Sequence, residues 1–385
     1  MPRRTWSTRS GASSIRIGMS TLPKDTDGFA GSYAEARSAW LGAVASHGGQ
    51  VTSLQHPDTG PRGEPLWLDV ARFGDPKAGS AFVVSCGTHG IEGYAGSAVQ
   101  TAWMNAGGPG ELPAGTAVVL VHAINPWGFA HGQRVTENNV DLNRNFIDFA
   151  SKPAPHAGYA ELHPDLMLER WDEAEIARAF AAMDAYRERA GEQAFSDAFN
   201  GGQYQSPEGL FYGGRQPEWS NRALARCVPQ ALGPARRCVW VDLHTGIGPY
   251  GLPFFFNFDA PGSWGRQRAL EIWGEEAFSG KGATHKAFAT YQGLMIDALG
   301  AMVPGCAMSP VVIEFGTHER RRMQRAHLAL AWMRRQRTAS EAFERAAAEY
   351  REAFVPSDPQ WRASVLREGV ALCQRGRDTL VAEVR

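Results

Sequence analysis

Apolar residues occur along this chain in short continuous runs, separated by amphipathic and turn-rich segments. Four of these runs show no alternation with polar residues, at residues 81–84, 117–121, 238–241 and 311–313. Continuous apolar runs of this length are typical of strands that are buried on both faces of a sheet. Helical segments between them would cover both faces of that sheet. The pattern therefore predicts an α/β fold with three α/β/α layers and a mixed central β-sheet.

The same pattern places further elements. Residues 29–47 and 94–106 are predicted to be helices, and residues 66–73 are predicted to be a strand. Residues 253–258 read as an aromatic strand of the core. After Glu319 one long helix is expected to about residue 352, and a second helix is expected at about 359–373.

The remaining segments indicate how the chain is divided into domains. Residues 1–24 are expected to be a disordered leader, although a transit peptide or an upstream start before Met19 would also explain the basic, Ser-rich composition. Residues 25–385 are expected to form a single domain that ends in C-terminal helices from about residue 319. Residues 150–220 look least regular, and we interpret them as an insertion that covers or lines the site.

Composition and charge narrow the functional classes. The 385 residues have a formal net charge of −1, so no overall field would recruit nucleic acid or an anionic membrane. No apolar stretch approaches the length of roughly 18 residues that indicates a membrane span. The five scattered cysteines do not resemble a disulfide framework, which favours a reducing cytoplasm. Serine-hydrolase, phosphate-binding and dinucleotide-binding motifs are not found either.

Candidate chemistry begins where the apolar run at 81–84 ends. His89 and Glu92 follow this run on a loop, with two residues between them. Open α/β sheets build their sites at the carboxyl ends of strands. Zinc accepts imidazole nitrogen and carboxylate oxygen, and a catalytic zinc takes three protein ligands. The pair alone is a weak signal, because a loop histidine bonded to a nearby carboxylate would look the same.

Two later strands end in similar side chains. His244 follows the run that begins at Cys238, and Asp242, on the same face of that strand, is a candidate for orienting its imidazole. Glu314 follows the run at 311–313. A glutamate inside an apolar strand is costly unless it is paired or functional, so Glu314 is a candidate catalytic residue.

A polar loop lies between these strands in the sequence. Residues 134–146 are rich in arginine and asparagine and include Arg134, Asn143 and Arg144. Such a segment can be a solvated loop. Its donors are also those that a substrate carboxylate or a developing oxyanion requires.

Taken in order, these motifs resemble a known superfamily. His-x-x-Glu, Asn-Pro-x-Gly, an arginine, Asp-Leu-Asn-Arg-Asn-Phe, a strand-end His and a strand-end Glu resemble the zinc carboxypeptidase (M14-like) superfamily. Gly-x-His-Gly-Ile-Glu-Gly, Val-Asp-Leu-Asn-Arg-Asn-Phe, Asp-Leu-His-Thr-Gly and Glu-Phe-Gly-Thr look like its DUF2817 branch. The resemblance covers roughly residues 60–320 and implies a zinc-carboxypeptidase-like fold.

The resemblance also implies roles for particular residues. It implies one Zn²⁺ per chain with three ligands, which are His89, Glu92 and His244. It implies that Glu314 is the general base and that Arg134 polarises the scissile carbonyl. Substrate-binding positions would be Asn143 and Arg144, which would grip a terminal carboxylate, and Tyr291, which is matched only by its distance before Glu314 and can equally be a packing residue.

These roles predict a zinc-dependent hydrolase that cleaves an amide bond next to a free carboxylate, in a small peptide or an N-acyl amino acid. Arg134 lies close to Asn143 in the sequence, nearer to the aspartoacylase and succinylglutamate desuccinylase branch. An N-acyl-amino-acid deacylase is therefore the alternative. A non-catalytic peptide-binding protein is a third reading, from a different class. No nucleic-acid or membrane partner is expected, and the oligomeric state stays open.

Overall fold

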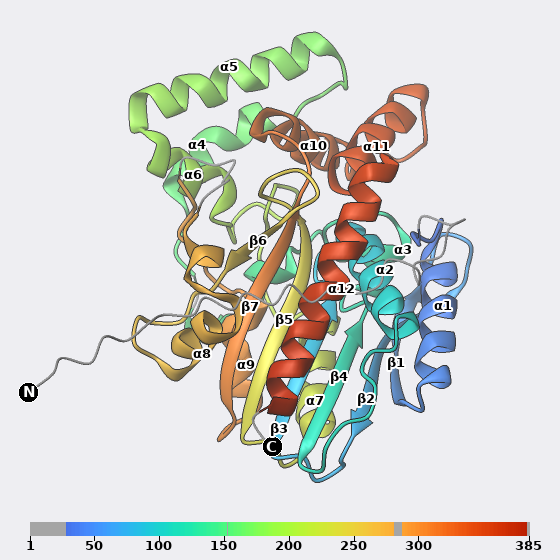
Figure 1. Cartoon of the computed structure of the whole chain (residues 1–385). Coiled ribbons are helices and arrows are strands. Elements are labelled where there is room, and N and C mark those ends of the chain that lie inside the picture. The colour runs from blue at the N-terminus through green and yellow to red at the C-terminus, as the bar shows by residue number, and fades with distance from the viewer. Residues whose placement is uncertain (1–27, 152, 281–286, 383–385) are drawn as a thin grey trace, which may run out of the picture.

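The centre of the molecule is a seven-stranded mixed sheet. A computed structural model describes residues 28–151, 153–280 and 287–382 (Figure 1). The strands have the spatial order β1-β2-β4-β3-β5-β7-β6, in which β4, β3, β5 and β7 are parallel and the outer strands are antiparallel. Their bounds are β1 Gln50–Thr59, β2 Pro65–Gly74, β3 Ser80–Cys86, β4 Thr116–His122, β5 Arg237–Gly246, β6 Pro253–Phe256 and β7 Ala307–Gly316.

The continuous apolar runs form the parallel centre of this sheet. Every residue of β3 and of β4 is buried, as expected for strands that are covered on both faces. β1 was not predicted, because it is an edge strand whose side chains are mostly exposed and polar. The predicted mixed sheet is confirmed.

One face of the sheet is covered by four helices, which are α1 Tyr33–Ser46, α2 Gly93–Asn105, α8 Trp264–Trp273 and α12 Pro359–Ala382 (Figure 1). Their apolar side chains share one core with the sheet, including Trp40, Trp103 and Trp361. α12 extends beyond residue 373, where it was predicted to end. Within the described residues, no helix is both long enough and apolar enough to cross a membrane.

The opposite face is covered by α7 Trp219–Leu232 and α9 Met295–Met302. Leu224 of α7 and Leu299 of α9 pack in the same cluster as Trp240 of β5. Helices therefore lie on both faces of the sheet, and the predicted three-layer α/β/α architecture is confirmed.

A further group of helices lies over the carboxyl ends of the parallel strands (Figure 1). We call it the helical cap; it comprises α4 Ala157–Leu166, α5 Glu173–Ala190, α6 Glu192–Asn200, α10 Arg320–Met333 and α11 Glu341–Phe354. Helices α4 to α6 and helices α10 and α11 are far apart in the sequence, but their buried side chains share one apolar cluster. The Arg325 guanidinium of α10 also pairs with Glu173 of α5 and Glu349 of α11. The smaller helix α3 Pro126–Ala130 packs near the loop that follows β3.

The prediction of one long helix from Glu319 to about residue 352 is wrong. α10 ends at Met333 and α11 begins at Glu341. The Ser340 hydroxyl accepts a hydrogen bond from the Phe343 amide at 3.2 Å and so caps the start of α11. The break lets the apolar faces of both helices join the cluster of the cap, which a single straight helix could not do.

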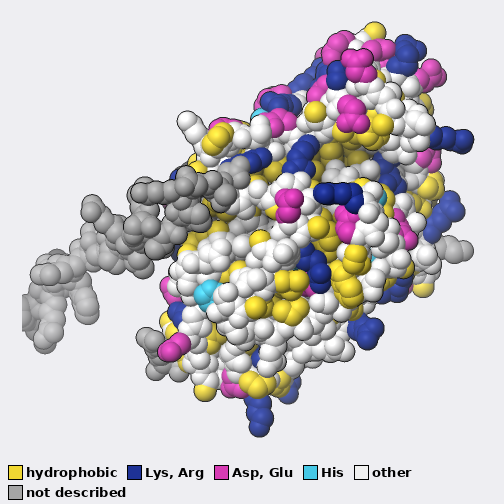
Figure 2. All heavy atoms as spheres, turned by 90° about the vertical axis from the view of Figure 1, so that its right-hand side faces the viewer, with side chains coloured by type: hydrophobic (Ala, Val, Ile, Leu, Met, Phe, Trp, Pro, Cys, Tyr) yellow, Lys and Arg dark blue, Asp and Glu magenta, His cyan; other side chains and the backbone are white. Residues whose placement is uncertain are grey.

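The surface carries charges of both signs. Figure 2 shows Lys and Arg side chains intermingled with Asp and Glu over the upper part of the molecule, where the cap lies. This arrangement agrees with the net charge of −1.

Candidate metal centre and substrate pocket

The loop after β3 turns sharply to place His89 and Glu92. His89 precedes a short 3-10 helix, Gly90–Glu92, that leads directly into α2. A Cβ atom on Gly90 would lie 2.1 Å from the backbone carbon of Gly128, so only glycine permits this close approach. The packing of this loop against α3 therefore fixes the direction of the two side chains.

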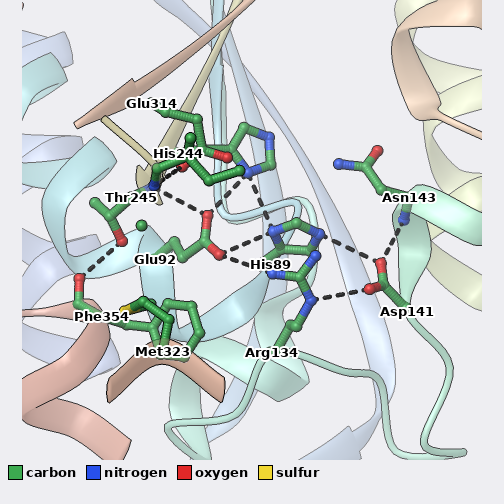
Figure 3. Close-up of polar contacts among 12 residues, drawn as sticks. His89, Glu92, Arg134, Asp141, Asn143, His244, Thr245, Glu314, Met323 and Phe354 are labelled. Atoms are coloured by element: carbon green, nitrogen blue, oxygen red, sulfur yellow. Dashed lines mark hydrogen bonds and ion pairs between the residues drawn. The ribbon is translucent and has the colours of Figure 1, made fainter. Parts of the chain in front are cut away.

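His89, Glu92 and His244 converge on one point (Figure 3). The Nδ1 atoms of the two histidines are 3.1 Å apart. His89 Nδ1 lies 2.9 Å from Glu92 Oε1, and His244 Nδ1 lies 2.8 Å from Glu92 Oε2. All three side chains are buried.

This arrangement fits a divalent metal ion. Bonds of about 2.0–2.2 Å in tetrahedral geometry hold neighbouring ligand atoms roughly 3.3 Å apart. The observed separation of the two ring nitrogens is 3.1 Å, close to that value. Burial opposes ionisation of Glu92, but the two histidines outweigh it and hold the pKa of this carboxyl well below its usual range. An ionised carboxylate and two converging imidazoles are a suitable donor set for zinc.

Two further carboxylates support the histidines from behind. Asp242 Oδ2 lies 2.6 Å from His244 Nε2, which leaves Nδ1 of this ring to face Glu92. Asp242 in turn accepts hydrogen bonds from Ser85 at 2.6 Å and from Thr88 at 2.9 Å. Asp141 Oδ1 lies 3.3 Å from His89 Nε2. Such outer partners set the orientation of a histidine ligand and raise its basicity.

Glu314 lies on β7, directly opposite His244 of β5 in the register of the sheet. Its Oε2 accepts a hydrogen bond from the Ile247 amide at 3.3 Å. Burial, together with the negative charge of Glu92, raises the pKa of Glu314 to about 7. A carboxyl with a pKa near neutrality can both take up and release a proton.

Arg134 is held between two carboxylates. Its Nε lies 2.9 Å from Asp141 Oδ2, and its Nη1 lies 3.2 Å from Glu92 Oε1. Its backbone amide donates to the Tyr350 hydroxyl of α11 at 2.9 Å. The cap therefore positions this loop directly.

Arg144 has a different environment. It lies in a 3-10 turn, Leu142–Arg144, that also places Asn143 toward the pocket. Its guanidinium donates to the carbonyl of Asn143 at 2.7 Å and to that of Asn200 at 2.6 Å. Its carbon Cζ lies 4.8 Å from the centre of the Tyr291 ring. Among the described residues no carboxylate pairs with Arg144, and burial lowers the pKa of its guanidinium.

These groups line one pocket, which encloses about 850 Å³ including the space at its open mouth. Apolar side chains of β6 and β7 and of the segments after β6 and before α9 also line the pocket, namely Phe256, Val312, Phe258 and Leu294. Side chains of the cap and of the loop before α7 cover the pocket, namely Phe211, Met323, His327 and Phe354. The pocket therefore extends on both sides of the metal-ligand candidates.

Comparison with known protein families places most of the chain in one family. The family model described as "Protein of unknown function (DUF2817)" matches residues 29–368. The chain belongs to the DUF2817 family. No curated protein matches it.

Several solved structures have weak similarity to this DUF2817 protein. Thrombin activatable fibrinolysis inhibitor is 13% identical, with 91% of this chain and 74% of that chain covered and a TM-score of 0.47. Carboxypeptidase A from Helicoverpa armigera is 12% identical, covering 92% and 75%, with a TM-score of 0.41. Succinylglutamate desuccinylase from Chromobacterium violaceum is 14% identical, covering 83% and 74%, with a TM-score of 0.35.

In this DUF2817 protein the structure brings together the residues that the sequence singled out. Seven of them line the pocket, namely His89, Arg134, Asn143, Arg144, His244, Tyr291 and Glu314, and Glu92 lies directly behind. Sequence analysis assigned Phe256 and Phe258 to the core, whereas both border the pocket. Phe211, Met323, His327 and Phe354 also line the pocket but were not predicted. Sequence patterns gave no signal for them, because their positions depend on how the cap and the loop before α7 pack over the sheet.

Proposed function

We propose that this protein is a zinc-dependent hydrolase that cleaves the amide bond next to a free carboxylate, in a small peptide or an N-acyl amino acid. One observation carries the proposal: the two histidines of a buried cluster of metal-ligand type line the same pocket as Arg144, which has no carboxylate partner among the described residues. His89 and His244, through Nδ1, and the carboxylate of Glu92 would hold one zinc ion per chain. Zinc, when bound, supplies a Lewis acid that polarises a carbonyl group and lowers the pKa of water.

Arg144 and Asn143 would bind the carboxylate of the substrate. The two Arg144 contacts are to backbone carbonyls, and among the described residues no carboxylate forms an ion pair with its guanidinium. The Asn143 oxygen accepts from the Met295 amide at 3.0 Å, which turns the NH₂ group of this side chain toward the pocket. A planar guanidinium and an amide together favour a carboxylate over a neutral group. Tyr291 stacks beside Arg144 and restricts its orientation.

Glu314 would carry the proton during the reaction. Ile247 holds its Oε2, which leaves Oε1 free to take a proton from the attacking water and deliver it to the leaving nitrogen. Its raised pKa, about 7, suits both steps. Arg134 has its place fixed by Asp141 and would stabilise the negative charge that develops on the carbonyl oxygen.

An N-acyl-amino-acid deacylase is the second candidate, and the arrangement around Asp141 favours it. Asp141 Oδ2 lies 2.9 Å from Arg134 Nε, and Asp141 Oδ1 accepts a hydrogen bond of 2.9 Å from the backbone N–H of Asn143. One carboxylate thus fixes both residues in one short loop, next to each other. Both candidates use the same chemistry and require the same free carboxylate.

The test is a pair of matched substrates that differ only at this carboxylate. Zinc-loaded protein is incubated with mixed dipeptides and N-acyl amino acids, as free acids and as C-terminal amides, and the products are measured by mass spectrometry. We expect cleavage of free acids and no detectable cleavage of the amides. Equal cleavage of both would contradict the carboxypeptidase and the deacylase proposals together. The relative rates for dipeptides and N-acyl amino acids would separate the two candidates.

A further inference from the structure

His327 of α10 is a polar residue of the pocket for which the proposed reaction has no use. Its ring is surrounded by aromatic side chains, with centroid distances of 4.7 Å to Phe211, 5.6 Å to Phe354 and 6.2 Å to Phe199. Nδ1 is buried and has no hydrogen-bond partner. Among the described residues, Nε2 has none either. A polar group left unpaired next to a pocket is expected to bind something that enters the pocket.

The charge state of this ring is set by its surroundings. Burial among the aromatic rings, with a contribution from the positive charge of Arg134, lowers the pKa of His327 to about 3. The ring is therefore neutral near pH 7. A neutral imidazole offers one N–H donor and one nitrogen acceptor but no charge.

His327 lies between Phe354 and Phe211, and the Phe211 ring also lies over the guanidinium groups of Arg134 and Arg144. Met323, one turn earlier on α10, and Phe354 both approach Gly246 on β5. Figure 3 shows Met323 and Phe354 on one side of His89 and Glu92, and Asn143 on the other. A substrate whose carboxylate contacts Arg144 and Asn143 would thus extend its acyl part toward Met323 and Phe354. His327, which contacts Phe354, would border that part of the substrate.

We call the part of the pocket near Met323, Phe354 and His327 the acyl side. Among its described residues, no charged side chain is left without a partner. Arg134 is engaged by Asp141 and Glu92. The Thr245 hydroxyl donates to the Phe354 carbonyl at 2.7 Å. A negatively charged acyl group, such as succinyl, would enter this apolar side without a free cation to pair with, which is costly.

We propose that this acyl side selects an uncharged, largely apolar acyl group that carries one neutral hydrogen-bonding group, and that His327 recognises that group. The amide that precedes the scissile bond in a peptide, or in an acylated dipeptide, has this chemistry. The inference rests on the proposed function, and names the acyl part of the substrate. It makes His327 a specificity-determining residue.

The experiment combines a substrate change with a residue change. Benzoyl-glycyl-phenylalanine carries an amide before the scissile bond. N-(4-phenylbutanoyl)-phenylalanine has the same length but carries methylene groups in place of that amide. Wild type and His327→Leu, both zinc-loaded, are compared on the two substrates. We expect His327→Leu to lower kcat/KM about tenfold for the first substrate and less than about twofold for the second, because it removes one hydrogen bond.

Binding provides a second readout that does not depend on turnover. In the Glu314→Gln background, titration calorimetry should show His327→Leu raising Kd about tenfold for benzoyl-glycyl-phenylalanine only. His327→Gln keeps a neutral donor and acceptor, and should restore most of the affinity. Wild type should also cleave N-succinyl-phenylalanine at least about tenfold less efficiently than the benzoyl-glycyl substrate, because of the unpaired charge. Equal zinc content and unfolding temperature would show that the His327 variants are folded.

The outcomes separate two kinds of failure. Equal losses for both acyl groups, or cleavage of the succinyl substrate as fast as of the benzoyl-glycyl one, would overturn the role of His327 while the proposed hydrolase stands. Absence of cleavage of all three free acids by wild type would overturn the proposed hydrolase. In that case, failure of Glu314→Gln to bind benzoyl-glycyl-phenylalanine would overturn the subsite as well.

Discussion

The metal-ligand side and the carboxylate-binding side share one pocket but balance their charges differently. Among the described residues, the carboxylates that pair with His89 and His244 are Glu92, Asp141 and Asp242, and the guanidinium of Arg134 contacts two of these three. Around Arg144 lie carbonyl oxygens and aromatic rings, and no carboxylate pairs with it among the described residues. The metal-ligand side carries excess negative charge that a bound cation would balance. The carboxylate-binding side carries a positive charge that a bound anion would balance.

The two arginines of one loop differ in the same way in how their charges are balanced. Arg134 and Arg144 are ten residues apart in sequence and both are largely buried, yet carboxylates raise the pKa of Arg134 whereas burial lowers that of Arg144. Arg134 is thus already paired before any substrate arrives. The partner of an arginine, rather than its presence in a pocket, indicates whether its full charge is available to bind a substrate carboxylate.

The largest effect is expected from breaking the metal-ligand side itself. His244→Ala should abolish both zinc binding and activity, because one of three ligands is lost. Wild type should gain about 4 kcal/mol of stability when free zinc exceeds Kd about 1,000-fold, and the variant should gain none. Metal analysis and thermal unfolding with and without zinc measure this. His163→Ala, on α4 and away from the cluster, is the control and should keep its zinc. Zinc retained by His244→Ala would contradict the assigned ligand set.

Glu314→Gln should separate chemistry from binding at the metal-ligand side. The amide keeps the size and one acceptor oxygen of the carboxyl, but it cannot take a proton from water. We expect kcat to fall by roughly 10²–10⁴ while zinc content is unchanged. Steady-state kinetics on a free-acid substrate, together with metal analysis, measure this. A variant with near-normal turnover would assign the proton transfer to another group.

The carboxylate-binding side is tested by Arg144→Lys, which keeps the charge and removes the planar fork. An ammonium group cannot make two parallel hydrogen bonds to a carboxylate. We expect kcat/KM for free-acid substrates to fall by roughly 10- to 100-fold, with zinc content unchanged. A loss of zinc in this variant would show that the two sides are not independent. Unchanged kinetics would mean that Arg144 binds no substrate carboxylate.

The smallest effect is expected from the support behind the metal ligands. Asp242→Asn should leave the three ligands in place but weaken the hydrogen bond that orients His244. Loss of such an outer partner typically reduces metal affinity by about 10- to 100-fold. A competition titration against a zinc chelator measures the change, with Ser85→Ala as a milder variant that removes one bond to Asp242. Wild-type affinity in Asp242→Asn would limit this carboxylate to a structural role.

The sequence could predict part of the metal-ligand side because His89, His244 and Glu314 are each tied to a strand. Parallel strands bring their carboxyl ends to one edge of the sheet, so these residues were expected at the same edge. The structure adds that β3, β5 and β7 are neighbours, which brings the three side chains together. Apolar runs revealed the strands, and the strands placed the side chains. The same reasoning gave the three layers of the fold.

The acyl side could not be predicted in this way. His327 lies on a helix whose sequence is charged and regular, and its role depends on how α10 packs over the sheet. The break between α10 and α11 was missed because Ser340 was not recognised as a helix cap. Such features depend on contacts between segments far apart in the sequence, which periodicity does not report.

The contacts of α11 have a consequence for how the protein is made. The Tyr350 hydroxyl accepts a hydrogen bond from the backbone amide of Arg134, and the Phe354 carbonyl accepts one from the Thr245 hydroxyl. The pocket is therefore held in place by residues that follow all the metal-ligand candidates in the sequence. Translation proceeds from the N-terminus, so Tyr350 and Phe354 are synthesised after every metal-ligand candidate. A premature stop codon between residues 315 and 340 would therefore yield a chain that keeps His89, Glu92, His244 and Glu314 but lacks these two hydrogen bonds.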